Sequence, residues 1–518
     1  MPDQATQILQ EPVLESEPDL RLQVPDLLPY LKADEKVVEV IHYPDINKPA
    51  TAGLPSSMAQ LLRFTGVEKV QDAGVLVASK AEDSEGRQEL KAYEVVFGRD
   101  SLIVAEFLRP YYLNLFRSTI LKMASLQGLE LNPMSEEESG KIVHEARDPH
   151  DPIAQEITSR LGWQWPYYGA IDSTPLYVKT LTTEAKDNPD FLLEKYVDKA
   201  GHEQSLLHSL DLAMEFIENS IAKSPLGLME YKRLNPNGLQ NQWWADSWDS
   251  MSDHAGRYPN FNQPIAALHV QALAYDALRG AADVYHELTG GPDAVHKSRA
   301  AKYEALADNI RQQLFTKFWK TDGEGGFFIV GLDRDDQGNY HQLDTKTAHM
   351  GLLLNSRLFD DRSTQSAYFV DRTVNVISSD EMQNASGLRT LSKKEKHFKP
   401  GGYHTGNVWL WVNNWVANGL DRQARNFGRP DYSKKAWELR EKTWRVVQKF
   451  KKFPELVNGG DGLEPRLNDR RVVISLAPDD AKFNLWSQGK NTIEQPAQDY
   501  QAWTIAAYID ALRKNNPL

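Results

Sequence analysis

Apolar residues recur at spacings of three and four over most of this chain, and no other feature constrains the fold more strongly. The spacing runs through residues 101–127, 205–222, 264–288, 298–319, 347–359, 434–450 and 498–515. Such a spacing puts apolar side chains on one face of an α-helix, and that face must be buried against another element. The sequence therefore predicts an all-α protein.

A second regularity concerns how the helices begin. Loops rich in Gly, Asp, Trp or His lead directly into apolar helices, and a more polar helix then follows. This order is seen at "FGRDSL", "YYGAIDSTPLYV", "WWADSWDS" with "QPIAAL", and "GGYHTGNVWLW". It predicts an (α/α)6 barrel, a toroid of helix pairs whose buried inner helices all begin at one rim. A simple stack of paired helices is the alternative, but it would not gather the polar residues at loop-to-helix junctions.

The N-terminal part of the chain differs from the rest in composition. Its first 55 residues are acidic and punctuated by proline, so we expect residues 1–75 to be an arm packed on a barrel domain of residues 76–518. Residues 73–96 read as a small hairpin with its turn at 82–88. A second hairpin is expected at 327–343, where the aspartates near Gly338 lack the terminal glutamate of a calcium loop.

Charge and composition argue against several classes of function. The formal net charge of −13 disfavours nucleic acid as a partner. No run of eighteen apolar residues is present, and the N-terminus does not resemble a signal peptide, so no membrane role is expected. The absence of cysteine excludes disulfides and thiol chemistry. We expect a cytoplasmic protein and make no prediction of its oligomeric state.

Aromatic residues cluster with polar ones instead of lying in apolar runs. The chain has 13 Trp, 20 Tyr and 18 Phe, and many fall in "GWQWPYYGAID", "NQWWADSWDS" and "GGYHTGNVWLWVNNW". Clustered rings beside hydrogen-bonding groups form surfaces on which sugars stack. A purely aromatic core is the simpler alternative for any single cluster, but three clusters favour a carbohydrate-binding site.

The segment 241–256 carries the most informative cluster. Asp246 and Asp249 lie among Trp243, Trp244 and Trp248. Apolar surroundings disfavour an ionised carboxylate and raise its pKa, which is what a proton donor near neutral pH requires. If the segment is helical, the two aspartates share a face and repel one another. Helix capping by either aspartate is the competing interpretation.

Several segments occur in an order that resembles a known family. They are "FGRDSL", "HEARD", "YYGAIDSTPLYV", "NQWWADSWDS", "SGLRTLS", "GGYHTGNVWL", "FPELVNGG" and "QAWTIAAYIDAL". Over residues 95–512 the chain resembles the glucosidase domain of glycogen-debranching enzymes and, more distantly, glucoamylase-like (α/α)6-barrel glycosidases. The resemblance implies an inverting, exo-acting α-glucosidase that uses no cofactor or metal and releases glucose from an α-glucan branch or short oligosaccharide.

The resemblance also implies the two catalytic carboxyls. "WADSWDS" aligns with the family's W-K-D-S-G-D-S, which makes Asp246 the general acid, although Ala245 and Trp248 replace the usual Lys and Gly. "FPEL" resembles the segment that carries the base, which points to Glu455. Glu464 and Glu494 remain rivals for that role. An inverting pair should lie about 6.5–9.5 Å apart.

Further residues of these motifs are expected to contact substrate. In related barrels the Arg-Asp pair of "FGRDSL" holds the terminal sugar, and the other motifs add hydroxyl contacts and stacking surfaces. The "YHTGNVWLW" segment departs from the family's W-P-H-D-N, keeping only Asn413. The predicted substrate-binding residues are Arg99, Asp100, His144, Glu145, Tyr168, Asp172, Trp243, Trp244, Trp248, Asp249, Arg389, His404 and Trp409.

Two alternatives to a glucan hydrolase stay open. The basic stretch "LSKKEKHFKP" is suited to an anionic aglycone such as the glycerate of a small glucoside, unless its charges are only solvated. The second alternative is a sugar-binding protein that has the barrel fold but no catalytic activity, since fold does not dictate function. An isomerase of the same helical class would use paired histidines, which are less evident here than the carboxylates.

Overall fold

The computed structural model describes residues 62–64, 74–79, 95–288, 294–468, 471–475, 492–496, 498 and 500–515. Most of the expected N-terminal arm and the expected turn at 82–88 lie outside these residues.

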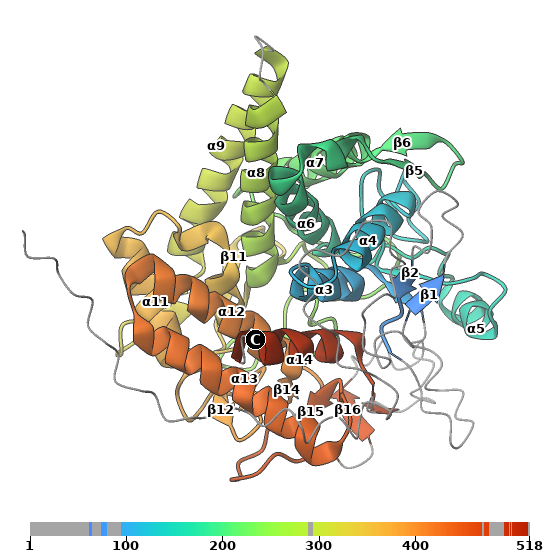
Figure 1. Cartoon of the computed structure of the whole chain (residues 1–518). Coiled ribbons are helices and arrows are strands. Elements are labelled where there is room, and N and C mark those ends of the chain that lie inside the picture. The colour runs from blue at the N-terminus through green and yellow to red at the C-terminus, as the bar shows by residue number, and fades with distance from the viewer. Residues whose placement is uncertain are drawn as a thin grey trace, which may run out of the picture.

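Six inner helices form a closed ring within the described part of the chain. They are α3 (Gly98–Leu108), α6 (Ser173–Asp187), α8 (Leu268–Leu288), α10 (His349–Leu352) continued by η3 (Leu353–Asn355), α12 (Leu410–Phe427) and α14 (Ala502–Asn515). Each packs on the next in this order, and α14 packs back on α3. Figure 1 shows this closure where the C-terminal helix lies beside α3.

Outer helices return the chain between successive inner ones. α4 (Leu113–Ser125), α7 (Leu206–Ala222), α9 (Ala294–Lys317), α11 (Thr364–Ile377) and α13 (Pro430–Phe450) each pack on the inner helix that precedes them. Burial separates the two layers. In α8, 16 of 21 residues are buried, whereas α13 buries 7 of 21. The prediction of an all-α barrel of helix pairs is confirmed.

One long helical segment of the sequence is divided in the structure. Residues 101–127 form the end of α3 and all of α4, with a break at 109–112. Pro110 lies in this break. Because proline lacks an N–H and its ring clashes with the preceding turn, it stops the inner helix and lets the chain reverse into the outer layer.

The protein also contains small antiparallel strand pairs in addition to the barrel helices. β10 (Gly331–Arg334) pairs with β11 (Tyr340–Leu343), with Gly331 opposite Leu343, so the predicted hairpin at 327–343 is confirmed. β2 (Gly74–Leu76) pairs with β1 (Leu62–Phe64). Beyond β2, the Ala78 amide donates to the Val95 carbonyl at 3.1 Å, which joins the two ends of the expected hairpin at 73–96. Residues 80–94 lie outside the described part of the chain, so the rest of that hairpin stays a prediction.

The remaining elements are short and lie outside the ring. They are α5 (Pro152–Leu161), η2 (Pro189–Leu193), β5 (Lys195–Val197), β6 (Glu203–Ser205), β7 (Ala266–Ala267), β8 (Trp319–Lys320), β9 (Phe327–Phe328), η4 (Arg357–Phe359), β12 (Gln383–Asn384), β13 (Gly387–Leu388), β16 (Arg471–Ser475) and β17 (Thr492–Pro496). No helix in the described residues is apolar over a length that would cross a membrane.

Candidate active site

Two short strand pairs bring distant motifs together at one rim of the barrel. β3 (Val96–Phe97) pairs with β4 (Glu145–Ala146), which joins "FGRDSL" to "HEARD". β14 (Val408–Trp409) pairs with β15 (Leu456–Val457), with Trp409 opposite Leu456, which joins "GGYHTGNVW" to "FPEL". The inner helices α3, α6, α12 and α14 begin beside these strands, so their positive N-terminal ends surround the site.

Arg99 lies at the centre of the site. Its Nη1 donates to Asp172 Oδ1 at 3.1 Å, and its Nη2 donates to Asp246 Oδ2 at 3.1 Å. Arg99 is 4% exposed and Asp172 is 1% exposed. Asp172 directly precedes α6 but makes no side-chain hydrogen bond that would cap this helix. One guanidinium therefore fixes two carboxylates from motifs far apart in the sequence.

Asp246 reaches from this buried pair toward solvent. Its side chain remains 27% exposed. Burial raises the pKa of Asp246 to about 6, since Arg99 opposes the shift only in part and Asp172 adds to it. The residue therefore retains a proton at a higher pH than an ordinary aspartate does, as a general acid requires.

Asp249 occupies a different position from Asp246. The described segment 241–256 contains no helix, so the two aspartates do not share a helix face as the sequence suggested. Asp249 is buried, and its Oδ1 accepts a hydrogen bond from the Ser247 hydroxyl at 2.9 Å. Burial raises the pKa of Asp249, while Ser247 opposes the shift.

Glu455 lies immediately before β15 and is 5% exposed. The Tyr403 hydroxyl donates to its Oε1 at 2.8 Å. Oε2 has no hydrogen-bond partner in the described part of the chain. Burial raises the pKa of Glu455 to about 8; Tyr403 opposes the shift, and the charges of Asp100 and Asp246 add to it. Glu455 thus belongs to the same electrostatic cluster as Asp246.

The two rival glutamates are placed differently. Glu464 has a side chain 74% exposed and pairs with Lys449 at 3.2 Å, away from the Arg99 cluster. Glu494 lies in β17, of which only the backbone is described. Glu455 is therefore the one of the three whose described side chain faces Asp246.

Asp100 completes the buried side of the site. It is 7% exposed, and the Gln501 amide lies 3.5 Å from its Oδ1. Burial raises the pKa of Asp100 to about 7, and Arg99 opposes the shift. Carboxyls that interact this strongly titrate as a group. The site can therefore hold protons near neutral pH on several oxygens close to one guanidinium.

His404 links the acid segment to the base segment. Its Nδ1 lies 2.9 Å from the Ser247 hydroxyl, and its ring stacks on Trp409 with centroids 4.9 Å apart. Burial lowers the pKa of His404 well below its usual value, so the ring stays neutral. The preceding residue, Tyr403, holds Glu455.

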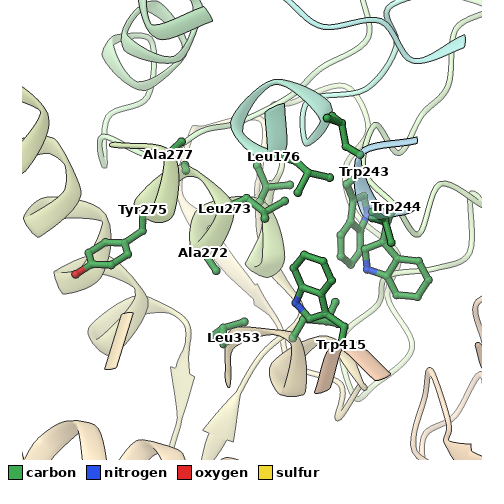
Figure 2. Close-up of a cluster of buried hydrophobic side chains, with 14 of the residues drawn as sticks. Leu176, Trp243, Trp244, Ala272, Leu273, Tyr275, Ala277, Leu353 and Trp415 are labelled. Carbon is green, nitrogen blue, oxygen red and sulfur yellow. The ribbon is translucent and has the colours of Figure 1, made fainter. Parts of the chain in front are cut away.

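Trp243 and Trp244 form a buried wall instead of the open sugar platform that the sequence suggested. Their exposed fractions are 0% and 1%. Both rings pack on His349, and Figure 2 shows the two indoles side by side among buried side chains such as Trp415. Only Trp248 of this cluster is half-buried. The two preceding tryptophans therefore desolvate the acid, and only the third offers a surface.

Residues 240–466 match the model of the mannosylglycerate hydrolase MGH1-like glycoside hydrolase domain. This part of the chain is therefore identified as a glycoside hydrolase domain. Both Asp246 and Glu455 fall inside the matched range, whereas Arg99, Asp100 and Asp172 come from the part of the barrel before it. Glycogen debranching, in contrast, stays a prediction.

The chain is also similar to solved structures at low identity. A bacterial glucoamylase complexed with acarbose shares 11% identity at a TM-score of 0.45, and the match covers 82% of this chain and 49% of that one. A GH63 mannosylglycerate hydrolase from Thermus thermophilus in complex with Tris shares 12% identity at a TM-score of 0.47, covering 89% and 98%. This chain thus spans about half the length of the glucoamylase. No curated protein matches the sequence.

Three residues expected to bind sugar have their polar groups bonded to the protein's own framework. The Tyr168 hydroxyl donates to the Leu126 carbonyl at 2.8 Å. Glu145 forms an ion pair with Arg147. The buried Arg389 guanidinium donates to the Gly459 carbonyl at 2.6 Å and to Asp461, and it also binds carbonyls of residues 380–383. These bonds make the three residues supports of the surrounding loops, and their contact with sugar stays a prediction.

His144 lies close enough to Arg99 for the arginine charge to affect its pKa. It is 5% exposed, packs edge-on against Phe97 and Tyr167, and leaves Nδ1 without a partner in the described residues. Burial and the Arg99 charge lower its pKa well below the usual value. A neutral imidazole with an open nitrogen near Arg99 is compatible with a sugar hydroxyl contact.

The sequence missed Tyr403, Ser247 and Gln501. Each one adjoins a motif residue in the chain: Tyr403 precedes His404, Ser247 follows Asp246, and Gln501 begins "QAW". The available signal was a hydroxyl or amide next to a candidate site residue. The sequence does not tell where each side chain points, because that depends on the strand pairs and on how the ring of inner helices closes.

Proposed function

We propose that the protein is an inverting, exo-acting α-glycosidase with Asp246 as general acid and Glu455 as general base. One observation supports this most strongly. Two buried carboxyls of raised pKa share one site, one held by Arg99 and partly open to solvent, the other held by Tyr403 with an oxygen left open. Inversion needs one carboxyl as acid and the other as base. Because the pKa of Glu455 lies above that of Asp246, the active form, with Asp246 protonated and Glu455 ionised, is the minority form of the singly protonated pair.

The proposed reaction is a single displacement. Glu455 Oε2 removes a proton from water, whose oxygen attacks the anomeric carbon. The bond from that carbon to the glycosidic oxygen breaks, and Asp246 gives its proton to the leaving oxygen. The product has inverted anomeric configuration. Arg99 opposes the rise that burial causes in the pKa of Asp100 and Asp172. It thereby favours their ionised forms, which would stabilise positive charge developing on the sugar ring.

The buried side of the site would hold the hexose that is released. Arg99, Asp100 and Asp172 form its floor, together with the neutral imidazole of His144. Fixed charged groups form strong bonds to sugar hydroxyls when water is excluded. Exo-acting cleavage needs a site that is closed behind the terminal hexose, and the burial of Arg99 and Asp172 supports this arrangement.

The leaving group distinguishes two candidate substrates. The sequence motifs favour an α-glucoside from a glucan branch or a short oligosaccharide. The match to a domain family named for mannosylglycerate hydrolase favours a small hexoside with a glycerate aglycone as the second candidate. We propose a short glycoside in either case.

Proton NMR of the reaction tests this proposal. The purified protein would be mixed with maltose, isomaltose, glucosylglycerate, mannosylglycerate and a branched limit dextrin, and the first anomer released would be observed. We expect β-glucose or β-mannose to appear before mutarotation. Initial α-anomer would contradict inversion. Binding without any turnover would favour the non-catalytic alternative.

A further inference from the structure

Three partly buried aromatic side chains pack on one another, and the first of them follows the proposed acid closely in the chain. Trp248 follows Asp246 by two residues and is half-buried. Its ring lies 4.3 Å from that of Tyr258, between centroids. Tyr258 in turn stacks on His397 at 4.5 Å, with ring planes 17° apart. We call Trp248, Tyr258 and His397 the aromatic wall.

Backbone contacts brace this wall between two loops. Lys396 Nζ donates to the Ala255 carbonyl at 2.8 Å, and His397 Nε2 lies 2.9 Å from the Gly256 carbonyl. His254 Nδ1 lies 2.8 Å from Glu395 Oε2. The acid-bearing loop is thus joined to the loop that leads into Tyr403 and His404. A wall held at this many points keeps its shape when a ligand arrives.

Its position matches that of a leaving group. The hexose that is cleaved would lie on the buried floor, where Asp172 is 1% and Glu455 is 5% exposed. Asp246 is 27% exposed and must face the glycosidic oxygen. A leaving group bonded to that oxygen extends outward from Asp246, and Trp248 is the half-buried aromatic residue next to it in the chain.

Charge near the wall is balanced. Lys393 pairs with Asp461 at 3.1 Å, and Lys394 pairs with Glu381 at 3.0 Å. Lys396 is bonded to a carbonyl, while Lys399 and His397 act on the buried Asp249 carboxyl. The basic stretch of the sequence therefore serves mainly to hold loops together, and it does not present a cluster of unopposed cations to an anionic aglycone.

We propose that Trp248, supported by Tyr258 and His397, is a leaving-group subsite that takes a neutral pyranose ring. This inference rests on the proposed function. The face of an indole stacks on the C–H face of a pyranose, and the polar groups beside it accept and donate to the hydroxyls. A subsite of this kind favours a leaving group that contains a sugar ring. The preferred substrate is therefore the end of an oligosaccharide and not a glycerate conjugate.

The test compares leaving groups on Trp248→Ala and on Trp248→Phe, which retains a ring. An α-glycosyl fluoride has no sugar in the leaving-group position, so it reports on the buried floor alone. We expect the ratio of kcat/KM for the disaccharide to that for the fluoride to fall at least tenfold in Trp248→Ala and much less in Trp248→Phe. Trp319→Ala, in an aromatic group beside α11, should not change this ratio.

The subsite would be overturned if Trp248→Ala left the ratio unchanged, including the case in which kcat/KM falls equally for the disaccharide and the fluoride. So would a wild-type preference for a glycerate-linked hexoside over every disaccharide. Failure of wild type on the fluoride as well would count against the proposed function instead. Even then, calorimetry can test the subsite by comparing the Kd of maltose with the Kd of glucose. Trp248→Ala should raise the Kd of maltose at least tenfold more than that of glucose. An equal rise for both sugars would overturn the subsite.

Discussion

The Tyr403 hydroxyl donates a hydrogen bond to Glu455 Oε1 at 2.8 Å and leaves the other carboxylate oxygen open. This bond stabilises the ionised form of a carboxyl whose pKa burial raises to about 8. Tyr403 is therefore a positioning residue for the proposed base. It orients the carboxylate and keeps part of the population ionised near neutral pH.

Tyr403→Phe removes this hydrogen bond without removing the ring. The pKa of Glu455 should rise further, because the group that favours its charged form is lost. We expect kcat to fall roughly tenfold, the order of one hydrogen bond to a charged group, and the alkaline limb of the pH profile to move upward. Tyr177→Phe, whose hydroxyl bonds Ser209 within the barrel, is the control. An unshifted profile would deny Tyr403 this role.

Activity should follow a bell-shaped pH profile with limbs near pH 6 and pH 8. The pKa of Asp246 is raised to about 6 and that of Glu455 to about 8. Below both values the base is protonated, above both the acid has lost its proton, and between them the pair shares one proton. Measuring kcat/KM from pH 4 to pH 10 checks this. A profile still rising at pH 10 would be incompatible with a protonated acid.

Asp246→Asn and Glu455→Gln should differ in their response to the leaving group. Fluoride departs without a proton, so the loss of the acid affects a glycosyl fluoride less than it affects a disaccharide. We expect Asp246→Asn to lose roughly 10³-fold on the disaccharide and far less on the fluoride. Glu455→Gln should lose activity on both, because water activation is needed in each reaction. If both variants lost activity equally on the disaccharide and the fluoride, the assignment of acid and base would be lost. If their patterns were reversed, the two roles would be exchanged.

Arg99→Ala should destabilise the fold as well as the site. It leaves Asp172, which is 1% exposed, without its charged partner. Removal of one member of a buried ion pair costs about 3–5 kcal/mol in the free energy of unfolding. Urea denaturation measures this, and Arg160→Ala, whose partner Glu156 is exposed, provides the surface control. A loss no larger than that of the control would show that Asp172 is not dependent on Arg99.

Gly98→Ala should disturb the site through the backbone. A Cβ at position 98 would lie 2.0 Å from the Val143 carbonyl oxygen, at the start of the helix that carries Arg99. The strand pair β3–β4 must then separate, at a cost of about 1–3 kcal/mol in stability together with lost activity. Gly323→Ala, which meets nothing within 4 Å, is the matched control. Thermal unfolding and kcat/KM for both variants measure the difference.

Much of the site could be predicted from short motifs, and some of it could not. Arg99, Asp100, Asp172 and Asp246 lie together as their motifs suggested. Tyr168, Glu145 and Arg389 were chosen on the same kind of evidence, yet their polar groups bond to the framework. A motif specifies which residue is present, but the direction of its side chain follows from neighbours that the motif does not contain.

The sequence by itself determined the helices and the chemistry available at their ends. Helical periodicity is a local property, since residues three and four apart meet on one face whatever the rest of the chain does. Only the tertiary structure decided that α14 closes the ring on α3, and that β14 pairs with β15 to bring Glu455 to the same site as Asp246. It also decided that Trp243 and Trp244 are buried while Trp248 is not. These are contacts between segments far apart in the chain, and their energy depends on which surfaces meet, not on the order of residues within either one.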